Sequence, residues 1–435
     1  MEDSDSDQHS SLLHHRQHQQ RLIRRHFQQL RARRNREAEE AALLCMALGV
    51  GGGPMRRLRT YLTRGDLPGD PLVDSAWAWM YRRQNDQAFI TTMGIDVKTF
   101  NKILGPFSIR WNSETIARAD VDQNGEPQVG RRVLDAAGCL GLVLHWLSST
   151  MAAYSLQQIF SLTPAVCSRY LSCGLQILLE ILKSLRKARI VWPSTEDAIQ
   201  PYAEAIEKKF PLLTRCFGFV DGLNLPVLVS DNEDVQNAYY NGWTCAHYCS
   251  CILAFAPDGT ILYAILNAPG SWHDSAIAGP LYNELLDNTP KGFRILSDTA
   301  FPRKSERLQS RILAPAKRGD RVPSSPGLYA RLKVLNEQIV KARQAAEWGM
   351  HSLQGSFARL KLPLPASDHQ FRADVLQVVC RLHQLRCRMV KINQTQTVYN
   401  SVWDELDVVS REFHKMLFKD IEKECHISRY YGDWL

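Results

Sequence analysis

Short apolar runs follow one another between residues 216 and 317, and their order constrains the fold more than any other feature of the chain. "CFGFV" (216–220) has the length and composition of a buried strand that ends at Asp221. "HYCSCILAFA" and "ILYAILNAPG" flank Asp258-Gly259, a pair typical of a β-hairpin turn. "KGFRILSD" predicts a fourth strand that ends at Asp298, and "RILAPAK" predicts a fifth.

Two helical segments belong to the same region. "DSAIAGPLYNELLDN" (274–288) has helical spacing and separates the third predicted strand from the fourth. Residues 328–360 predict one long helix, because apolar side chains recur every three or four positions, at Leu328, Leu332, Leu335, Ile339, Ala342, Ala346, Met350, Leu353 and Phe357. This order of elements predicts an α/β fold in which a mixed sheet is flanked by helices.

The residues before the sheet, 61–205, are expected to be mostly helical. Ser155 with Gln158 fits a capping box, and Thr163-Pro164 fits an N-cap followed by proline at the first helical position. Two short helices followed by a long apolar one fit a helix-turn-helix, and an ordinary helical bundle fits as well. The would-be recognition helix carries only Arg169 as a base, which is poor for reading a DNA groove.

Length and composition allow two or three domains, because the chain has 435 residues of which 45% are hydrophobic. We expect a basic, flexible N-terminal region (1–60), a helical domain (61–205), a sheet domain (210–395) and a C-terminal helical tail (396–435). The eleven cysteines follow an acidic, polar N-terminus that is unlike a secretory leader, which favours reduced thiols. No apolar run has the length of a membrane span, so we expect no membrane partner.

The N-terminal region contains a basic block. Between His14 and Arg36 there are eight arginines and no acid, and the whole chain has a formal net charge of +8. Both features favour an anionic partner. A nucleic-acid or nuclear-import patch and a solvated helical arm are equally good interpretations of this block. Its candidate DNA contacts are Arg24, Arg25, Arg33 and Arg34.

Three acids stand where chemistry would be expected in such a fold. Asp221 and Asp298 end two predicted strands, and Glu347 lies on the long helix that follows. Active sites of α/β sheets gather at strand ends, so these carboxylates can converge there. Three carboxylates would repel one another unless cations lay between them, and oxygen ligands suit Mg²⁺ or Mn²⁺. Two such ions could hold the attacking and leaving oxygens of a phosphodiester.

Each acid also has an ordinary structural interpretation. Asp221-Gly222 could form a turn, Asp298 could cap a turn or helix, and Glu347 could pair with Arg343 or His351 one helical turn away. Considered singly, each acid is better explained by such a role. The order of strands and helices around all three together favours a metal site.

"NAPGSWHDSAI" (267–277) adds two more candidates. Ser271 with Asp274 fits a capping box, which is a sufficient structural role for Asp274. His273 could orient a metal-bound water or contact phosphate. We therefore place His273 and Asp274 beside the primary ligands and keep Asp274 as an additional candidate metal ligand.

"CAHYCSC" (245–251) invites a zinc interpretation, because cysteine and histidine alternate along it. Side chains that alternate along one strand are spread too far apart for a single tetrahedral ion. Small buried residues are therefore the better interpretation of Cys245, Cys249 and Cys251.

Five blocks in this order resemble the Harbinger-type (PIF/Harbinger) DDE transposases and the nucleases derived from them, in particular fungal members. They are "FGFVDG", "NAYYNGW", "LNAPGSWHDS", "LSDTAF" and "RQAAEWGM", and "RLHQLRCRMVKINQ" resembles the closing helix of the family. Two departures concern the acid motifs. Asn224 stands where histidine is common, and Phe301 stands where tyrosine is usual.

The resemblance implies an RNase H-like fold for residues 210–395 and a catalytic triad of Asp221, Asp298 and Glu347 that binds two divalent ions. It also implies DNA as substrate, the nucleus as location and, frequently, a separate Myb-like DNA-binding partner. Two DNA ends would need at least two active sites or sequential action, which leaves a homo-oligomer open. Further candidate phosphate contacts are Arg343, Arg359 and Lys361.

The sequence therefore favours a metal-dependent DNA nuclease or transposase that cleaves, and in a transposase also joins, phosphodiesters. One alternative is a catalytically retired, transposase-derived DNA-binding protein. Another is a glycosidase-like hydrolase, which would use two carboxylates but leave the third acid and the basic balance unexplained.

Overall fold

The computed structural model describes residues 61–116, 125–301, 305–316 and 325–399. The basic N-terminal block with Arg24, Arg25, Arg33 and Arg34 lies outside these residues, as does most of the predicted C-terminal tail. Internal contacts divide the chain between Thr60 and Tyr61, and every described residue belongs to the second unit.

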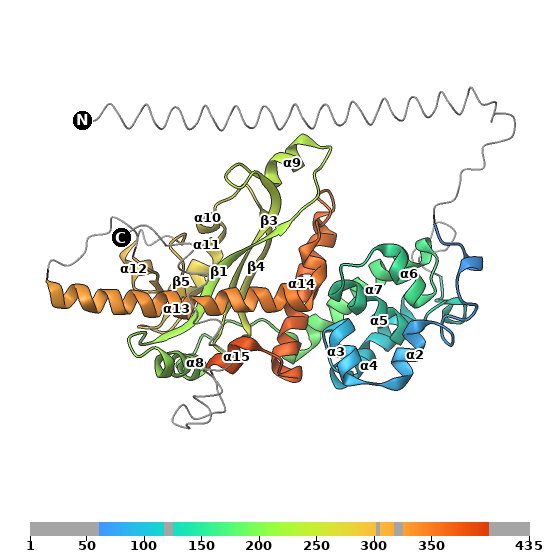
Figure 1. The fold of residues 1–435 in the computed structure, drawn as a ribbon, viewed down its shortest axis with the longest axis horizontal. Helices are drawn as coiled ribbons and strands as arrows, with labels where there is room; N and C mark the ends of the chain where they lie inside the picture. Colours follow the sequence, from blue (N-terminus) through green and yellow to red (C-terminus); the bar gives the residue numbers. More distant parts are fainter. Residues whose placement is uncertain (1–60, 117–124, 302–304, 317–324, 400–435) are drawn as a thin grey trace, which may run out of the picture. The chain divides into compact units, whose positions relative to one another are not determined.

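Helices make up most of the described residues (Figure 1). Before the sheet they are α2 (Ala76–Arg83), α3 (Asp86–Met93), α4 (Val97–Ser113), α5 (Ala136–Ser148), α6 (Ala153–Phe160), α7 (Pro164–Ser184) and α8 (Glu196–Lys209). Within and after the sheet they are α9 (Glu233–Tyr239), α10 (Asp274–Ile277), α11 (Gly279–Asp287), α12 (Glu306–Gln309), α13 (Pro326–Ser356), α14 (His369–Leu385) and α15 (Gln394–Tyr399).

The strands of the described part form one mixed sheet with β1 in its middle. They are β1 (Cys216–Pro226), β2 (Tyr240–Asn241), β3 (Ala246–Phe255), β4 (Ile261–Pro269), β5 (Arg294–Ser297) and β6 (Ile312–Leu313). β1 pairs antiparallel with β3 and parallel with β5; β4 and the short β2 pair with β3, and β6 pairs with β5. The predicted fold class is confirmed: a helical region precedes a mixed sheet flanked by helices, which is consistent with an RNase H-like fold.

β1 is longer than the sequence suggested. The strand was predicted to end at Asp221, but it runs on to Pro226, and Asp221 pairs with Leu253 of β3 in mid-strand. The reason is visible in the residues that follow, because Leu223 and Leu225 are buried while Asn224 between them is exposed. This alternation is a strand period, and it overrides the turn preference of Asp-Gly.

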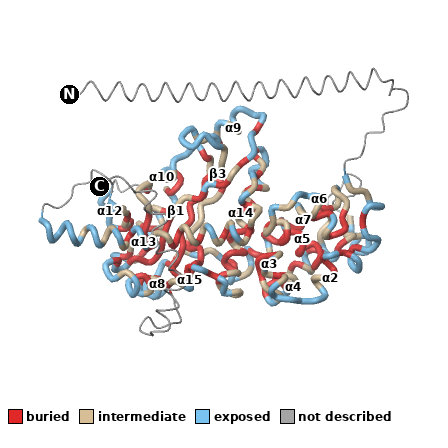
Figure 2. Tube along the Cα trace, viewed as in Figure 1, coloured by how far each residue is buried: buried red, intermediate tan, exposed pale blue. Residues whose placement is uncertain are grey.

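Helices cover both faces of the sheet, as the buried core along β1 and β3 in Figure 2 reflects. One face packs against α10 and α11, through a cluster that includes Val220, Ile252, Ile277, Leu281 and Leu285. The other face packs against α13, α14 and α15, through a cluster that includes Phe219, Phe255, Ala346, Val379 and Tyr399. Successive residues of β1 therefore face different helices.

The second of these clusters continues into the helical region. It includes buried side chains of α4, α5 and α7, such as Phe107, Leu144 and Leu178, and α14 packs directly against α7. By length and composition alone, α7 would be able to cross a membrane. Its buried side chains, however, pack against α5 and α14, which gives the helix a place in the core.

Two predicted helix starts have different outcomes. Thr163 is the N-cap of α7 with Pro164 at the first position, as predicted, although its side chain makes no capping hydrogen bond. The predicted capping box at Ser155 and Gln158 is wrong, because α6 begins at Ala153 and both residues lie inside it. α6 and α7 are joined by three residues, and α7 includes Arg169.

The apolar stripe of the long helix α13 is buried in its C-terminal half but not at its N-terminal end. Ile339, Ala342, Ala346 and Leu353 are buried as the stripe predicts, but Leu328 is exposed. Figure 1 shows α13 lying across the sheet with its first turns beyond the sheet's edge. The C-terminal half of the helix is therefore the part held firmly against β1 and β3.

Candidate active site

Strand register places Asp221 and Asp298 side by side. β1 and β5 are parallel, and Val220 of β1 pairs with Ser297 of β5. The next residue on each chain is an acid, so the two carboxylates project from neighbouring positions in the middle of the sheet. Asp298 also accepts a hydrogen bond at Oδ1 from the backbone N–H of Ala300 over 2.9 Å, which orders the turn after β5.

Glu347 reaches this position through an arginine on its own helix. Arg343 donates to Asp221 Oδ2 over 2.9 Å and to Glu347 Oε1 over 2.7 Å. The pairing of Glu347 with Arg343 that the sequence left open is thus present, and it includes Asp221 as well. One guanidinium joins acids from β1 and α13, and it neutralises part of their charge.

Burial and charge act together on Asp221, whose side chain is 16% exposed. The pKa of Asp221 is raised to about 6: burial is the main cause, the charges of Asp298 and Glu347 contribute, and the Gly222 N–H and Arg343 act in the opposite direction. An acid that resists ionisation until near neutral pH is frequent at functional sites, where a cation completes the charge balance.

Asp274 meets β1 from the opposite face. A Cβ placed on Gly222 would lie 2.7 Å from Asp274 Oδ2, so a larger residue at this position would force the carboxylate to move. Burial, followed by the charge of Asp298, raises the pKa of Asp274. The charge of Asp298 therefore acts on both Asp221 and Asp274.

The predicted capping role of Asp274 is wrong. His273 is the N-cap of α10, and its Nδ1 accepts from the backbone N–H of Ser275 over 3.3 Å, while Asp274 is the first helical residue. The side chain of Asp274 is therefore left for the contact at Gly222. His273 is exposed, and its ring is held by Ser275 instead of by an acid.

Tyr282 belongs to the same neighbourhood, and the sequence gave no reason to select it. Burial raises the pKa of its phenol, and the charges of Asp274 and Asp298 raise it further. Within the described part of the chain, its hydroxyl is buried and has no hydrogen-bond partner. The helical spacing from Asp274 to Tyr282, two turns, was the available signal, since it places both residues on one side of the α10–α11 segment.

The two candidate contacts after α13 differ in their surroundings. The guanidinium of Arg359 lies 4.5 Å from the centre of the Trp146 ring, and burial lowers its pKa. Arg359 therefore has a packing role between the end of α13 and α5. Lys361 is exposed and free to meet an anion.

The two departures from the Harbinger motifs also have structural counterparts. Asn224 is exposed on β1 and accepts a hydrogen bond from Ser250 Oγ over 2.9 Å. Phe301 is buried in the cluster beneath α11 and supplies no polar group. Neither residue occupies the position of an acid.

The cysteines of "CAHYCSC" do not come together as a zinc site. Cys245 is exposed in a turn, whereas Cys249 and Cys251 are buried in β3. All the described cysteines are free.

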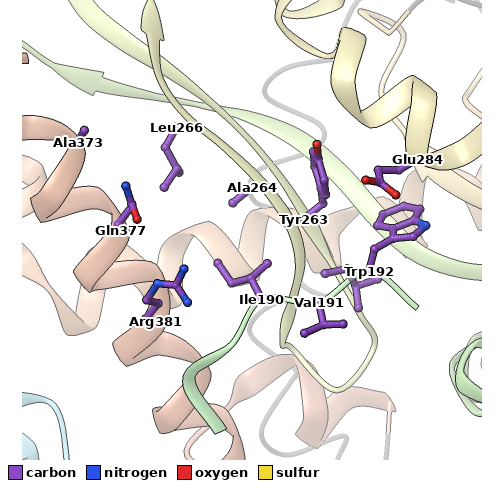
Figure 3. A pocket seen from close by; sticks show the side chains of 11 residues that line it. Ile190, Val191, Trp192, Tyr263, Ala264, Leu266, Glu284, Ala373, Gln377 and Arg381 are labelled. Carbon is purple, nitrogen blue, oxygen red and sulfur yellow. The ribbon is translucent and has the colours of Figure 1, made fainter. Parts of the chain in front are cut away.

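Figure 3 shows the residues that line a cavity, whose volume is about 670 Å³. It is bounded by β4, by the segment 190–192 and by α14, with Trp192, Tyr263 and Arg381 among its lining residues. Asp221, Asp298 and Glu347 do not line it. The candidate chemistry is therefore at the middle of the sheet and not in this cavity.

The acids fit divalent ions by donor type, since all are carboxylates and Mg²⁺ prefers oxygen. The buried hydroxyl of Tyr282 has no hydrogen-bond partner among the described residues, so a group bound near Asp274 and Asp298 could supply one. As they stand, however, no group of three or more His, Cys, Asp or Glu residues within the described ranges is arranged to hold an ion. Arg343 occupies the space between Asp221 and Glu347 instead.

Comparison with protein-family models gives a match, which includes the candidate acids. Residues 220–384, from β1 to α14, match the family model described as DDE superfamily endonuclease. These residues form a DDE endonuclease domain. The match covers less than half of the chain, and the DDE domain contains Asp221, Asp298 and Glu347 as well as Asp274 and Arg343. Neither the curated proteins nor the solved structures gave a significant match.

Proposed function

We propose that the protein is a divalent-metal-dependent DNA endonuclease or transposase of the Harbinger type, in which Asp221, Asp298 and Glu347 are the catalytic acids. One observation carries the proposal: the parallel register of β1 and β5 brings Asp221 beside Asp298, inside a region that matches DDE endonucleases. Glu347 is linked to the same point through Arg343.

Each acid has a role that follows from its place. Asp221, on the central strand, would hold both ions; Asp298 would hold one and Glu347 the other, and Asp274 is an additional candidate ligand next to Asp298. When bound, two divalent ions would favour in-line attack on a phosphodiester and stabilise the leaving oxygen. The guanidinium of Arg343 lies among the acids, where it is within reach of a phosphate held there.

The wider biology is part of the proposal. Harbinger-type enzymes act on DNA in the nucleus, frequently with a separate Myb-like DNA-binding protein, and we propose the same setting for this chain. A homo-oligomer would supply the two active sites that two DNA ends require. The net charge of +8 supports an anionic substrate.

The test is nicking of a supercoiled plasmid by the purified full chain with Mg²⁺ or Mn²⁺. We expect metal-dependent nicking that is lost in Asp298→Ala and Glu347→Ala. Glu337→Ala is the matched control, because Glu337 is an exposed acid on the same helix as Glu347. A chelator should abolish nicking, whereas a glycosidase-like hydrolase would be indifferent to it.

A retired DNA-binding protein is the second candidate. The observation that favours it is the ion pairing of Arg343, which satisfies two of the acids without metal. If this candidate is right, the protein should bind DNA tightly without nicking it, and the wild type and Glu347→Ala should have equal DNA affinity.

A further inference from the structure

Two tryptophans stand exposed on two loops that a hydrogen bond joins, and the second loop leads to Asp274. Trp243 is 95% exposed in the turn between β2 and β3, and Trp272 is 57% exposed just before His273 and Asp274. Leaving a large apolar ring in water is unfavourable, so such residues on ordered loops are frequently binding sites.

One side chain holds both loops in place. Asn241 donates from Nδ2 to the backbone oxygen of Gly270 over 2.8 Å. Its Oδ1 accepts from the backbone N–H groups of Trp243 over 3.0 Å and Thr244 over 3.2 Å. Trp243 follows Asn241 by two residues, and Trp272 follows Gly270 by two residues, so the hydrogen bond between Asn241 and Gly270 fixes both loops. The entropy cost of ordering the loops is therefore met on folding and not on binding.

The loop with Trp272 is also fixed against the sheet. A Cβ on Gly270 would lie 2.0 Å from the backbone oxygen of Tyr248, so the loop approaches β3 as closely as a backbone can. Ser271 donates its N–H to Ala238 O over 3.2 Å. From this anchored point the chain runs through Trp272 to Asp274, whose carboxylate lies against Gly222, the residue that follows Asp221 on β1.

The charged side chains of α9, the helix that leads into β2 and the Trp243 turn, are acids. The first turn of α9, which precedes the Trp243 turn, carries the exposed acids Glu233 and Asp234. Acids repel the DNA backbone, whereas aromatic rings bind the faces of unpaired bases regardless of sequence. The surface therefore suits bases that have left the duplex.

We propose that Trp243 and Trp272 form a stacking site for unpaired DNA bases next to the phosphodiester that the acids act on. The inference rests on the proposed function, since it takes DNA as the substrate. It adds a binding surface for the opened strand that lies outside the acids. Asn241 is its positioning residue, because it fixes the turn that presents Trp243.

The test uses the full chain in chelator, so that binding is measured without cleavage. Affinity is compared for a blunt fluorescent duplex and for the same duplex with a single-stranded thymine tail. We expect Trp243→Ala and Trp272→Ala each to weaken binding of the tailed duplex about tenfold while leaving the blunt duplex unchanged. Phe at either position should retain most of the affinity, and Asn241→Ala should reproduce part of the Trp243→Ala loss.

Trp79→Ala is the matched control. Trp79 on α2 is 59% exposed, comparable to Trp272, but it lies under the guanidinium of Arg83 at 4.8 Å and belongs to the helical region. This variant should bind both probes as the wild type does. The salt dependence of binding should also be unchanged in the Trp243 and Trp272 variants, since base stacking replaces no phosphate contacts.

The possible failures are distinguishable. If the wild type binds the tailed duplex and both alanine variants bind it equally well, the stacking site is wrong while the nuclease proposal stands. If the alanine variants lose affinity for both probes with a smaller salt slope, the tryptophan loops contact duplex backbone and the inference is also wrong. If the wild type binds neither probe, the proposed function fails and the inference fails with it.

Discussion

Arg343 on α13 donates a 2.9 Å hydrogen bond to Asp221 on β1, and this ion pair spans the two elements that the proposed chemistry must bring together. Asp221 is 16% exposed and Arg343 is 23% exposed, so water screens the pair only in part. The same guanidinium also binds Glu347. In the absence of divalent ions, Arg343 is therefore the cation that allows these acids to coexist.

Replacing Arg343 should make the protein depend more on divalent ions. In Arg343→Gln, Asp221 and Glu347 lose their positive partner, and we expect a loss of about 1–3 kcal/mol of unfolding free energy in chelator. Added Mn²⁺ should then raise the melting temperature more than it does in the wild type, because the ion no longer competes with an arginine. Thermal unfolding with and without Mn²⁺ measures both effects.

The control for this prediction is Arg331→Gln, which removes an exposed arginine from the same helix. Its response to Mn²⁺ should equal that of the wild type. A metal-induced shift in Arg343→Gln no larger than this control would show that Arg343 does not stand in the place of a cation.

Ionisation of Asp221 should lower the unfolding free energy of the metal-free protein as pH rises. Its pKa is about 6 in the folded chain and near the ordinary value of 3.8 in the unfolded chain. The folded state therefore keeps a proton that the unfolded state has lost, and the associated stability is complete below about pH 4 and disappears as pH rises through 6. The full change is on the order of 3 kcal/mol.

Asp221→Asn lacks this titration, which gives the measurement its reference. In chelator, the melting temperature of the wild type should fall relative to that of Asp221→Asn between about pH 4 and about pH 6. With Mn²⁺ the difference should reverse, because the ionised carboxylate then has a cation. Parallel pH profiles of the two proteins in chelator would contradict the raised pKa.

Gly222→Ala tests the close contact between β1 and Asp274, and it should destabilise the protein. The added Cβ would lie 2.7 Å from Asp274 Oδ2, and we expect a cost of about 1–3 kcal/mol from overpacking. The double variant Gly222→Ala with Asp274→Ala should be less destabilised than the sum of the single variants, since the clash is then gone. Urea unfolding of the four proteins completes the cycle.

Gly105→Ala serves as the control glycine, because nothing lies within 4 Å of its Cβ position on α4. It should be neutral or slightly stabilising. Strict additivity between the Gly222 and Asp274 variants would place Asp274 away from the strand and remove it from the site.

Gly349 should prove necessary for the position of α13. A Cβ there would lie 2.7 Å from the Phe255 ring, so Gly349→Ala would push the helix away from β3, two residues after Glu347. We expect a loss of about 1–3 kcal/mol and slower plasmid nicking. Gly355→Ala on the same helix meets nothing within 4 Å, and it should retain wild-type nicking with equal or higher stability. Equal behaviour of the two variants would rule out this close approach.

The sequence predicted the sheet well because its strands are marked by local patterns. The β3–β4 hairpin turns at Asp258-Gly259 as expected, with Gly259 at a φ of +77° that favours glycine. Asp298 follows β5 directly, again as expected. Such features depend on a few adjacent residues, which the sequence contains in full.

The details of the site were harder to predict from the sequence, because they depend on contacts between residues far apart in the chain. Nothing local in "VDGLN" reveals that Asp274 presses on Gly222 from the other face, or that Arg343 reaches across to Asp221. The predicted cap at Ser271 was a plausible local solution, but His273 took the capping position. Tertiary contacts decided between local options that were close in energy.

The apolar cluster that runs from the sheet into α4, α5 and α7 has a consequence for how the DDE domain could be recombined with other proteins, in evolution or by engineering. α14 closes the DDE domain, yet it rests on α7, and Arg386 beyond it binds the backbone oxygen of Gly94. A fragment restricted to residues 220–384 would expose to water the apolar side chains of α14 that pack against α7. We therefore expect that the DDE domain cannot be moved into another protein by itself, and that the helical region would have to be moved with it.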